Sequence, residues 1–221
     1  MDVTTAVFKR RSIRHFTNQT VDPALLRAVL DKARAAPSGG NLQPWHATVL
    51  TDESLSQLKQ EMGAALMAPP GSEMPEYRIY PEALPDPWRA RRGANGEALY
   101  AALGIAREDK TGRFAQLARN FEFFGAPVGL FVHMPRLMGP PQWADLGIWL
   151  QTVMLLLVEV GLGSCPQEAW SAYPETVRRV AQIPQDHLLF CGLAIGWPDL
   201  TAANDFPNPR APLEETVRFL S

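Results

Sequence analysis

The spacing of hydrophobic positions along the 221-residue chain changes from segment to segment. Apolar residues three or four positions apart, in two cases behind a capping residue (Asp2 and Asp22), predict helices. These lie at residues 3–10, 22–36, 53–67, 94–106, 111–123, 143–160 and 174–181. Short apolar runs predict strands at residues 45–51, 128–133 and 188–195. No repeat or linker interrupts this order, so we expect a single domain over residues 1–221.

The helix predicted at residues 143–160 is apolar nearly all round. A helix at the surface of a soluble protein normally has a polar face, so this one must be covered on every side. The apolar stretch is interrupted by Gln151, Thr152 and Glu159. It is also shorter than the roughly 20 apolar residues that cross a bilayer. We therefore expect a buried helix and no membrane partner.

Prolines mark two segments that are not expected to form regular structure. Residues 68–88 hold six of the 20 prolines, a density that predicts a surface excursion or lid, and we assign residues 68–95 as a variable lid or insert. Residues 199–221 carry three more prolines and predict an extended C-terminal arm with a short final turn. Residues 35–51, by contrast, contain no charged side chain. That Gly-rich loop is expected to pack against another surface.

Composition restricts the possible function classes. The chain is 46% hydrophobic, which excludes wholesale disorder. Lys and Arg number 21 against 23 Asp and Glu, a net charge of −2. This balance argues against a general nucleic-acid or anionic-membrane partner, which would require a basic excess. Two cysteines, Cys165 and Cys191, provide no disulfide framework, and no signal-peptide core follows the N-terminus, so we expect a cytoplasmic protein.

Several well-known motifs are absent or incomplete. Residues 161–166 begin like a dinucleotide-binding fingerprint, but a helix precedes them and a proline occupies the sixth position. There is no phosphate loop, no His-Glu-x-x-His and no Gly-x-Ser-x-Gly. The four histidines lie far apart, and none pairs with a cysteine or carboxylate at ligand spacing; they are His15, His46, His133 and His187. We therefore predict no metal site.

Four basic residues fall within the six positions 9–14. One interpretation is a phosphate clamp, because Arg guanidinium groups bind phosphate bidentately and the Ser12 hydroxyl adds a donor. The other is a solvated charge run or a nucleic-acid contact. Taken alone, the segment leaves both open.

Three further segments carry candidate chemistry. Residues 37–45 alternate glycines with Ser, Asn and Gln, which suit close approach to a flat ring and hydrogen bonding to its edge; an ordinary helix-to-strand loop has a similar composition. Residues 161–170 directly follow the apolar helix. Arg210 lies on the proline-rich tail.

In order and spacing, these four segments resemble the nitroreductase family of FMN-dependent flavoproteins over nearly the whole chain. The first is similar to that family's Arg-Ser-x-Arg start, and the second to its Pro-Ser-x-x-Asn-x-Gln-Pro-Trp loop. The third resembles the Gly-Leu-Gly and Pro-x-Glu turn after the long central helix. The Gly-x-x-x-Gly-x-Pro at residues 192–198 and the late Pro-Arg are similar too.

The resemblance implies an α+β sandwich with a central mixed sheet, in an intertwined homodimer whose interface contains the apolar helix. FMN would bind between subunits, with its phosphate at the basic segment and Arg210, the partner's loop 37–43 along the ribityl chain and ring, and the turn 166–168 beside the isoalloxazine. The implied cofactor-binding residues are Arg10, Arg11, Ser12, Arg14, Pro37, Ser38, Gly39, Asn41, Gln43, Asn120, Pro166, Gln167, Glu168 and Arg210.

The chain departs from the family pattern at two positions. Many members carry a basic residue shortly after the Asn in the helix before the second strand, whereas Asn120 is followed by Phe-Glu-Phe-Phe. A flavin contact there would rest on Asn120 alone. Asn208 stands where the family has a Lys or Arg two residues before the tail Arg.

By the same resemblance, NAD(P)H would reduce the flavin and an aromatic acceptor would then take its place, a ping-pong cycle that needs no catalytic side chain. The expected acceptors are nitroaromatics or quinones. Candidate substrate contacts are Tyr100, Phe123 and Phe124, although the two phenylalanines could equally be core or lid aromatics. Arg89, Arg91 and Arg92 could steer an anionic acceptor or form a solvated surface cluster.

Two alternative functions stay open at this point. One is reductive dehalogenation of a halophenol on the same fold. The other, from a different class, is a flavin-free dimer that binds nucleic acid through Arg10, Arg11 and Arg14.

Overall fold

A four-stranded sheet forms the centre of the protein. The computed structural model describes residues 1–199, 204–206 and 208–220. In spatial order the strands are β1 (His46–Thr51), β2 (Val128–Pro135), β4 (His187–Gly196) and β3 (Gly163–Gln167), and each pairs antiparallel with its neighbour. We expected a mixed sheet; within the described residues, parallel pairing is confined to a single bridge between Ser12 and Ser164.

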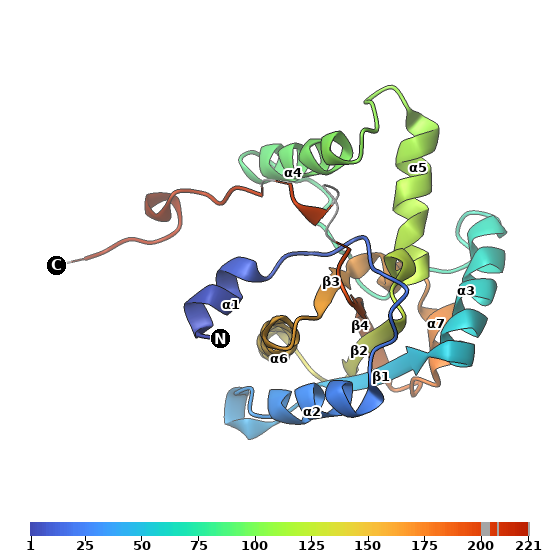
Figure 1. The fold of residues 1–221 in the computed structure, drawn as a ribbon, viewed down its shortest axis with the longest axis horizontal. Helices are drawn as coiled ribbons and strands as arrows, with labels where there is room; N and C mark the ends of the chain where they lie inside the picture. Colours follow the sequence, from blue (N-terminus) through green and yellow to red (C-terminus); the bar gives the residue numbers. More distant parts are fainter. Residues whose placement is uncertain (200–203, 207, 221) are drawn as a thin grey trace.

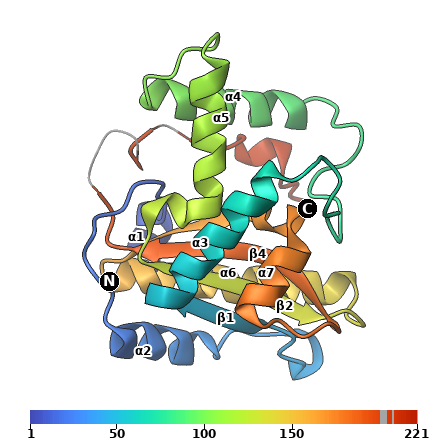
Figure 2. The same ribbon diagram turned by 90° about the vertical axis from the view of Figure 1, so that its right-hand side faces the viewer.

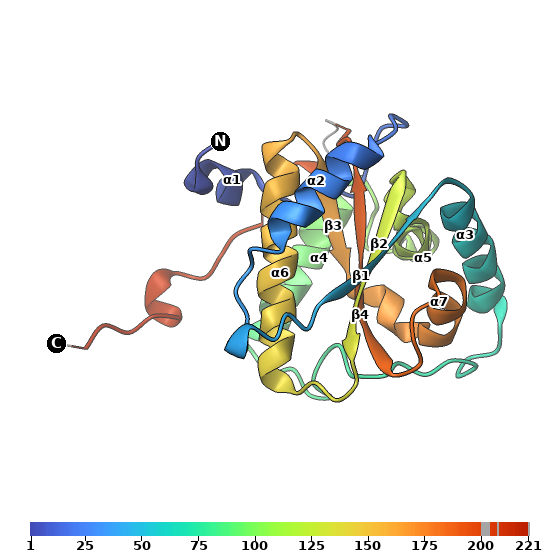
Figure 3. The ribbon, with the colours of Figure 1, turned by 90° about the horizontal axis from the view of Figure 1, so that it is seen from below.

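Two helices cover one face of the sheet (Figure 3). They are α2 (Pro23–Ala33) and α6 (Pro140–Glu159), and they enclose one of the two apolar cores. Asp22 caps α2 by accepting from the backbone N–H of Ala24 at 2.8 Å, and Pro23 occupies the first turn, as expected from the sequence. The short helix α1 (Val3–Lys9) packs against α6.

The opposite face is covered by α3 (Asp52–Met67), α7 (Pro174–Ala181) and two 3₁₀ segments (Figures 2 and 3). The 3₁₀ segments are η2 (Arg119–Gly125) and η3 (Glu168–Ala172). The fully buried Trp170 lies at the centre of this second core and stacks on Phe123, with 4.5 Å between ring centroids. Helices on both faces of one sheet give the expected α+β sandwich.

The remaining two helices project beyond this sandwich (Figure 2). They are α4 (Trp88–Ala102) and α5 (Lys110–Ala118). No described residue of α4 is buried, while Trp88 is 56% exposed and Phe114 of α5 is 70% exposed. The single chain therefore leaves apolar side chains of α4 and α5 exposed.

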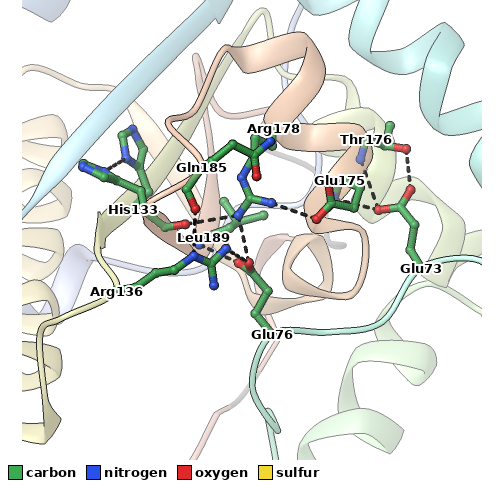
Figure 4. A network of polar contacts seen from close by, with 10 residues as sticks. Glu73, Glu76, His133, Arg136, Glu175, Thr176, Arg178, Gln185 and Leu189 are labelled. Carbon is green, nitrogen blue, oxygen red and sulfur yellow. Dashed lines mark hydrogen bonds and ion pairs between the residues drawn. The ribbon is translucent and has the colours of Figure 1, made fainter.

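Segment 68–87 has no helix or strand, as its prolines predicted, but it is firmly attached to the body (Figure 4). Glu73 accepts from the backbone N–H groups of Glu175 and Thr176 at the start of α7, at 2.8 and 3.1 Å. Glu76 accepts from the N–H of Leu189 in β4 at 3.0 Å. The segment therefore straps the edge of β4 to the N-terminus of α7, at least over residues 73–76.

The C-terminal residues extend away from the body (Figure 1). Residues 213–220 are exposed and include the 3₁₀ turn η5 (Leu213–Glu215), which matches the predicted arm with a short final turn. Glu215 pairs with Arg91 of α4. Of the arm assigned to residues 199–221, positions 200–203, 207 and 221, including Pro207, lie outside the described residues.

The predicted helices and strands agree with the observed ones to within three residues at each end, except at β3, α4 and α5. Strand β3 was missed, because Gly163 and Pro166 make its sequence look like a turn. Helix α4 begins at Trp88 rather than Ala94, because its first turns are charged and bury nothing, so they show no apolar period. Helix α5 ends at Ala118 rather than Phe123, because the chain turns into η2, where the φ of Phe123 is 50°.

None of the described helices is long and apolar enough to cross a membrane. Helix α6 buries seven residues against the sheet and α2. Its opposite face exposes Gly147 and Ile148, the latter at 41%. The sequence predicts that this apolar helix is covered on every side. Its own chain covers one side.

Candidate functional site

The two ends of the chain meet around a basic cavity of about 660 Å³. The five basic-segment and tail residues named from the sequence all line it, together with Phe8 and Phe206. These five are Arg10, Arg11, Ser12, Arg14 and Arg210. The structure therefore brings together two segments that lie about two hundred residues apart in sequence.

The basic segment is held against β3 by backbone pairing. Ser12 bridges to Ser164, and the N–H of Ile13 donates to the carbonyl of Ser164 at 2.9 Å. Gly163 allows this approach, because a Cβ there would lie 2.8 Å from the side chain of Ile13. The first and third candidate segments are thereby neighbours in space.

Asn204 fixes the tail to the same segment. Its side-chain oxygen accepts from the N–H groups of Arg14 and His15, at 2.7 and 3.2 Å. Its amide nitrogen donates to the carbonyls of His15 and Asp199, at 2.8 and 2.7 Å. Four hydrogen bonds on a side chain that is 8% exposed hold the backbone that presents Arg14.

The charges around the cavity fit an anion. Partial burial, and after it the positive charge of Arg210, lower the pKa of Arg10. The Nε of Arg10 is buried without a hydrogen-bond partner among the described residues. Arg11, by contrast, pairs with Asp205. A phosphate bound here would compensate the two neighbouring positive charges of Arg10 and Arg210. It would also accept a hydrogen bond from the unpartnered Nε of Arg10.

Arg119 lies next to the same group of residues and was missed from the sequence. Its Nη1 donates to Nε2 of His15 at 3.0 Å, and its guanidinium lies 5.8 Å from the Phe124 ring centroid. The Arg14 guanidinium lies 6.0 Å from the same ring. Desolvation and Arg119 lower the pKa of His15, which keeps its ring neutral as an acceptor. The sequence signal for this residue is a basic side chain directly before Asn120, whereas the family pattern places one after the Asn.

The third candidate segment joins Asn120 directly. Gln167 in β3 donates through Nε2 to the carbonyl and side-chain oxygens of Asn120, at 2.7 and 3.3 Å. Its Oε1 accepts from Nε1 of Trp170 at 3.3 Å. Pro166 precedes it in β3 and Glu168 follows in η3, where desolvation raises the pKa of that carboxyl.

The loop at residues 37–43 does not line the basic cavity of its own chain. It runs from the end of α2 toward β1 and contains the 3₁₀ turn η1 (Gly39–Asn41). Ser38 Oγ accepts from the N–H of Gln43 at 2.9 Å, and Gln43 Nε2 donates to the carbonyl of Asn41 at 3.1 Å. Pro37, like Gln43, is exposed. The residues of this loop therefore lie together, but at a different surface from the one that contains the basic cavity.

The candidate substrate contacts lie in two different environments. Phe123 and Phe124 are 0% and 3% exposed, so the structure places both rings in the core, which corrects their assignment as substrate contacts. Tyr100 lies on α4, and the Arg113 guanidinium stacks over its ring at 4.2 Å from the centroid. Its ring is therefore engaged in a cation–π contact with α5.

The arginine triplet on α4 is largely occupied by the protein itself. Arg89 pairs with Asp86 at 3.0 Å, and Arg91 pairs with Glu215. The Arg92 guanidinium lies 4.1 Å from the centroid of the Tyr80 ring. The triplet therefore presents less free positive charge than its sequence suggested.

Three of the four histidines come together, contrary to their expected separation. His133 and His187 face each other with 2.8 Å between their Nδ1 atoms, and His46 lies 4.6 Å from His187 between ring centroids. Burial, with His187 and His46, lowers the pKa of His133 to about 4. The antiparallel pairing of β1, β2 and β4 causes this cluster. Across residues 1–199, 204–206 and 208–220, no group of His, Cys, Asp or Glu is arranged to hold a metal ion.

Comparison with known proteins identifies the family of this architecture. A family model described as the nitroreductase family matches residues 7–197. The chain is 35% identical to chloronitrobenzene nitroreductase of Comamonas testosteroni over 215 residues, which cover 96% of this chain and 93% of that protein. It is 31% identical to 4-nitrobenzoate reductase of Pseudomonas putida over 220 residues, covering 99% and 96%.

Solved structures agree over the full chain. An FMN- and NADPH-dependent nitroreductase NfnB from Sphigopyxis sp. strain HMH is 51% identical, with a TM-score of 0.98 and 100% of both chains covered. The FMN-dependent nitroreductase NfnB from Mycobacterium smegmatis, in complex with NADPH, is 31% identical with a TM-score of 0.92, again covering 100% of both chains. The α+β fold class expected from the sequence is confirmed.

Proposed function

Because the chain belongs to the nitroreductase family and is an FMN-dependent NAD(P)H oxidoreductase, we propose that it reduces nitroaromatic compounds. The observation that carries this proposal is the basic cavity, whose residues are those that a phosphate-bearing flavin requires. Relatives named for nitrobenzene and 4-nitrobenzoate reduction support the acceptor class. Quinones are further acceptors in this proposal, because they are also flat rings that accept electrons.

The residues of the cavity would hold the cofactor by its phosphate. Arg10, Arg14 and Arg210 supply positive charge, and the Ser12 hydroxyl and the orphaned Nε of Arg10 supply donors. The turn at residues 166–168 would bind beside the flavin ring, with Asn120 held in place by Gln167. FMN, when bound, supplies the chemistry of accepting and donating hydride.

The proposal includes a homodimer with shared sites. The loop at residues 37–43 lies outside its own chain's basic cavity, so its polar groups would serve the partner's. The exposed apolar side chains of α4, α5, α6 and the arm provide surface for such an assembly. In the same picture, residues 68–95 border the acceptor, with Tyr100 the remaining candidate contact, and residues 1–221 form one domain.

Each site of this dimer would admit NAD(P)H and the acceptor in turn, which gives ping-pong kinetics. No side chain is assigned as a proton donor or acceptor. The protein's part is to bind and orient, through the backbone N–H groups of the 166–168 turn and the nearby guanidinium groups. Double-reciprocal plots at several acceptor concentrations should therefore be parallel.

The test is NAD(P)H oxidation by the purified, flavin-loaded protein with nitrobenzene, 4-nitrobenzoate, a quinone and a halophenol. We expect a yellow protein absorbing near about 450 nm and turnover with the nitro compounds. Dehalogenation of the halophenol without nitro reduction would favour the dehalogenase alternative. The non-enzymatic nucleic-acid alternative is set aside, because the chain is an oxidoreductase.

The occupied arginines of α4 refine the expected acceptor preference. Because Arg89 and Arg91 already pair with carboxylates, they offer little attraction to an anionic acceptor. We therefore expect kcat/KM for uncharged nitrobenzene to equal or exceed that for 4-nitrobenzoate. A strong preference for the carboxylate would show that free positive charge lines the acceptor site.

A further inference from the structure

Helix α6 buries a carboxylate within its apolar face. Asp145 is 6% exposed, and its neighbours on the covered side, Leu146 and Trp149, are 0% and 3% exposed. A buried carboxylate is costly unless hydrogen bonds or a cation compensate for the lost water. What compensates for burying Asp145 therefore indicates what the residue does.

The compensating group is in the loop after α2. Oδ1 of Asp145 accepts from the backbone N–H of Gly39 at 3.1 Å. Oδ2 is buried, with no hydrogen-bond partner among the described residues. The hydrogen bonding of this carboxylate is thus directed to the loop and not to another part of the core.

A second attachment lies one turn along the same helix. The indole of Trp45, at the end of the loop, stacks on that of Trp149, with 6.3 Å between ring centroids and 13° between planes. Asp145 and Trp149 are four residues apart, so they lie on one face of α6. The loop from Gly39 to Trp45 is therefore attached to α6 at both ends.

The backbone of the loop between these attachments adopts an energetically costly conformation. Gly40, Asn41 and Gln43 all have φ between 50° and 57°, in the left-handed region. Non-glycine residues adopt this region at a cost and keep it where surrounding contacts determine it. The Ser38 side chain closes the turn from within, so outside support comes from α6.

We propose that Asp145 is a positioning residue that holds the loop at residues 38–43 in the conformation that binds FMN. This rests on the proposed function, because that function makes the loop part of a cofactor site. This role requires no contact between Asp145 and the cofactor. It acts by fixing the N–H of Gly39, and so the direction in which Ser38 and Asn41 present their polar groups.

The test compares two substitutions of similar size. Asp145→Leu removes the acceptor but also removes a buried charge, and Gly39 is an exposed residue, so we expect the fold to be retained. Asp145→Asn keeps an acceptor for Gly39. In the apo protein, amide exchange at Gly39 and Asn41 should be at least about tenfold faster in the Leu variant and near wild type in the Asn variant. The FMN dissociation constant should rise about tenfold in the Leu variant alone.

A control and a stability measurement separate positioning from a structural role. Asp31→Asn alters an exposed carboxylate on α2 and should leave loop exchange and FMN affinity unchanged. The Tm of Asp145→Leu should match or exceed wild type. The proposal would be overturned if amide exchange in the loop were equal in all variants, or if it were as fast in the Asn variant as in the Leu variant. A wild-type protein that fails to bind FMN would defeat the proposed function instead, while amide exchange at Gly39 would still decide the role of Asp145.

Discussion

Arg10 and Arg11 are adjacent in sequence but lie in different electrostatic surroundings. Arg11 is neutralised by Asp205, whereas Arg10 has a buried Nε without a partner among the described residues and a second cation, Arg210, close by. An anion bound in the cavity would relieve the Arg10–Arg210 repulsion. It would gain less from a guanidinium that already has a carboxylate. The pattern Arg-Arg-Ser-x-Arg therefore contains residues of unequal importance.

This difference predicts the order of two substitutions. Arg10→Ala should weaken FMN binding by about 1.5–3 kcal/mol, the range for a hydrogen bond to a charged group, and Arg11→Ala by less. Titration of the apo protein with FMN, followed by flavin fluorescence, measures both. Arg34→Ala, which removes an exposed arginine at the C-cap of α2, is the control. Equal losses for Arg10 and Arg11 would mean that Asp205 does not hold Arg11 in the loaded protein.

At the scale of elements, the proline-rich segment is a strap rather than a free loop. Glu76 binds Arg178, which is 4% exposed, and also Arg136 and the N–H of Leu189 (Figure 4). Burial opposes ionisation of Glu76, but hydrogen bonds from the two arginines and the N–H of Leu189, with the charge of Arg178, outweigh it and lower the pKa of the carboxyl. Tyr77 donates to the carbonyl of Phe190, next along β4. The strap thus occupies backbone groups of a sheet edge that β3 is too short to cover.

The strap predicts a large effect at one glutamate and a small effect at another. Glu76→Ala should lower the free energy of unfolding by about 3–5 kcal/mol, because it leaves the buried Arg178 without its buried counterion. Glu82→Ala removes a partner from the exposed pair with Arg78 and should cost less than about 1 kcal/mol. Urea denaturation of the two variants makes the comparison. Similar small losses would show that the strap does not contribute to the stability of β4 and α7.

At the scale of the whole molecule, apolar surface remains open on three sides of the single chain. The face of α6, the α4–α5 pair and the arm all expose large apolar side chains, among them Ile148, Trp88 and Phe219, the last at 82%. Open apolar surface of this extent marks an interaction site. In the proposed homodimer, a second copy of the chain would cover this surface and bring its loop at residues 37–43 to the basic cavity.

A truncation separates the two roles of the arm. Ending the chain after Ala211 keeps Arg210 in the cavity but removes four exposed apolar residues, Leu213, Val217, Phe219 and Leu220. If the chain forms the proposed homodimer, its dissociation constant should rise at least tenfold on truncation, because buried apolar area drives association. Sedimentation of the full and shortened chains at several concentrations measures it. In the full chain, Arg210→Ala should weaken FMN binding and leave the dimer intact; an unchanged dimer in the shortened chain would exclude the arm from the interface.

Much of this architecture follows from the sequence alone. The start signals specify α1, α2 and α7 to within a few residues, because Asp2 and Asp22 cap the first two helices and Pro174 opens the third. The family of the chain also follows from four local segments, since binding a phosphate and a flat ring requires particular residue types at short spacing. Net charge near zero with a local basic cluster is compatible with a small anion as ligand, and the resemblance to the family favoured that interpretation.

The tertiary structure decided how those residues are used, because long-range contacts leave no local pattern. β3 forms only because β4 offers an edge to a segment containing Gly163 and Pro166. Arg119 reaches the basic segment, and Asp145 reaches Gly39, across more than a hundred residues of sequence. From the sequence, Phe123 is a possible substrate contact, but its packing against Trp170 places it in the core. Local sequence determines which groups are present, and folding determines which of them meet.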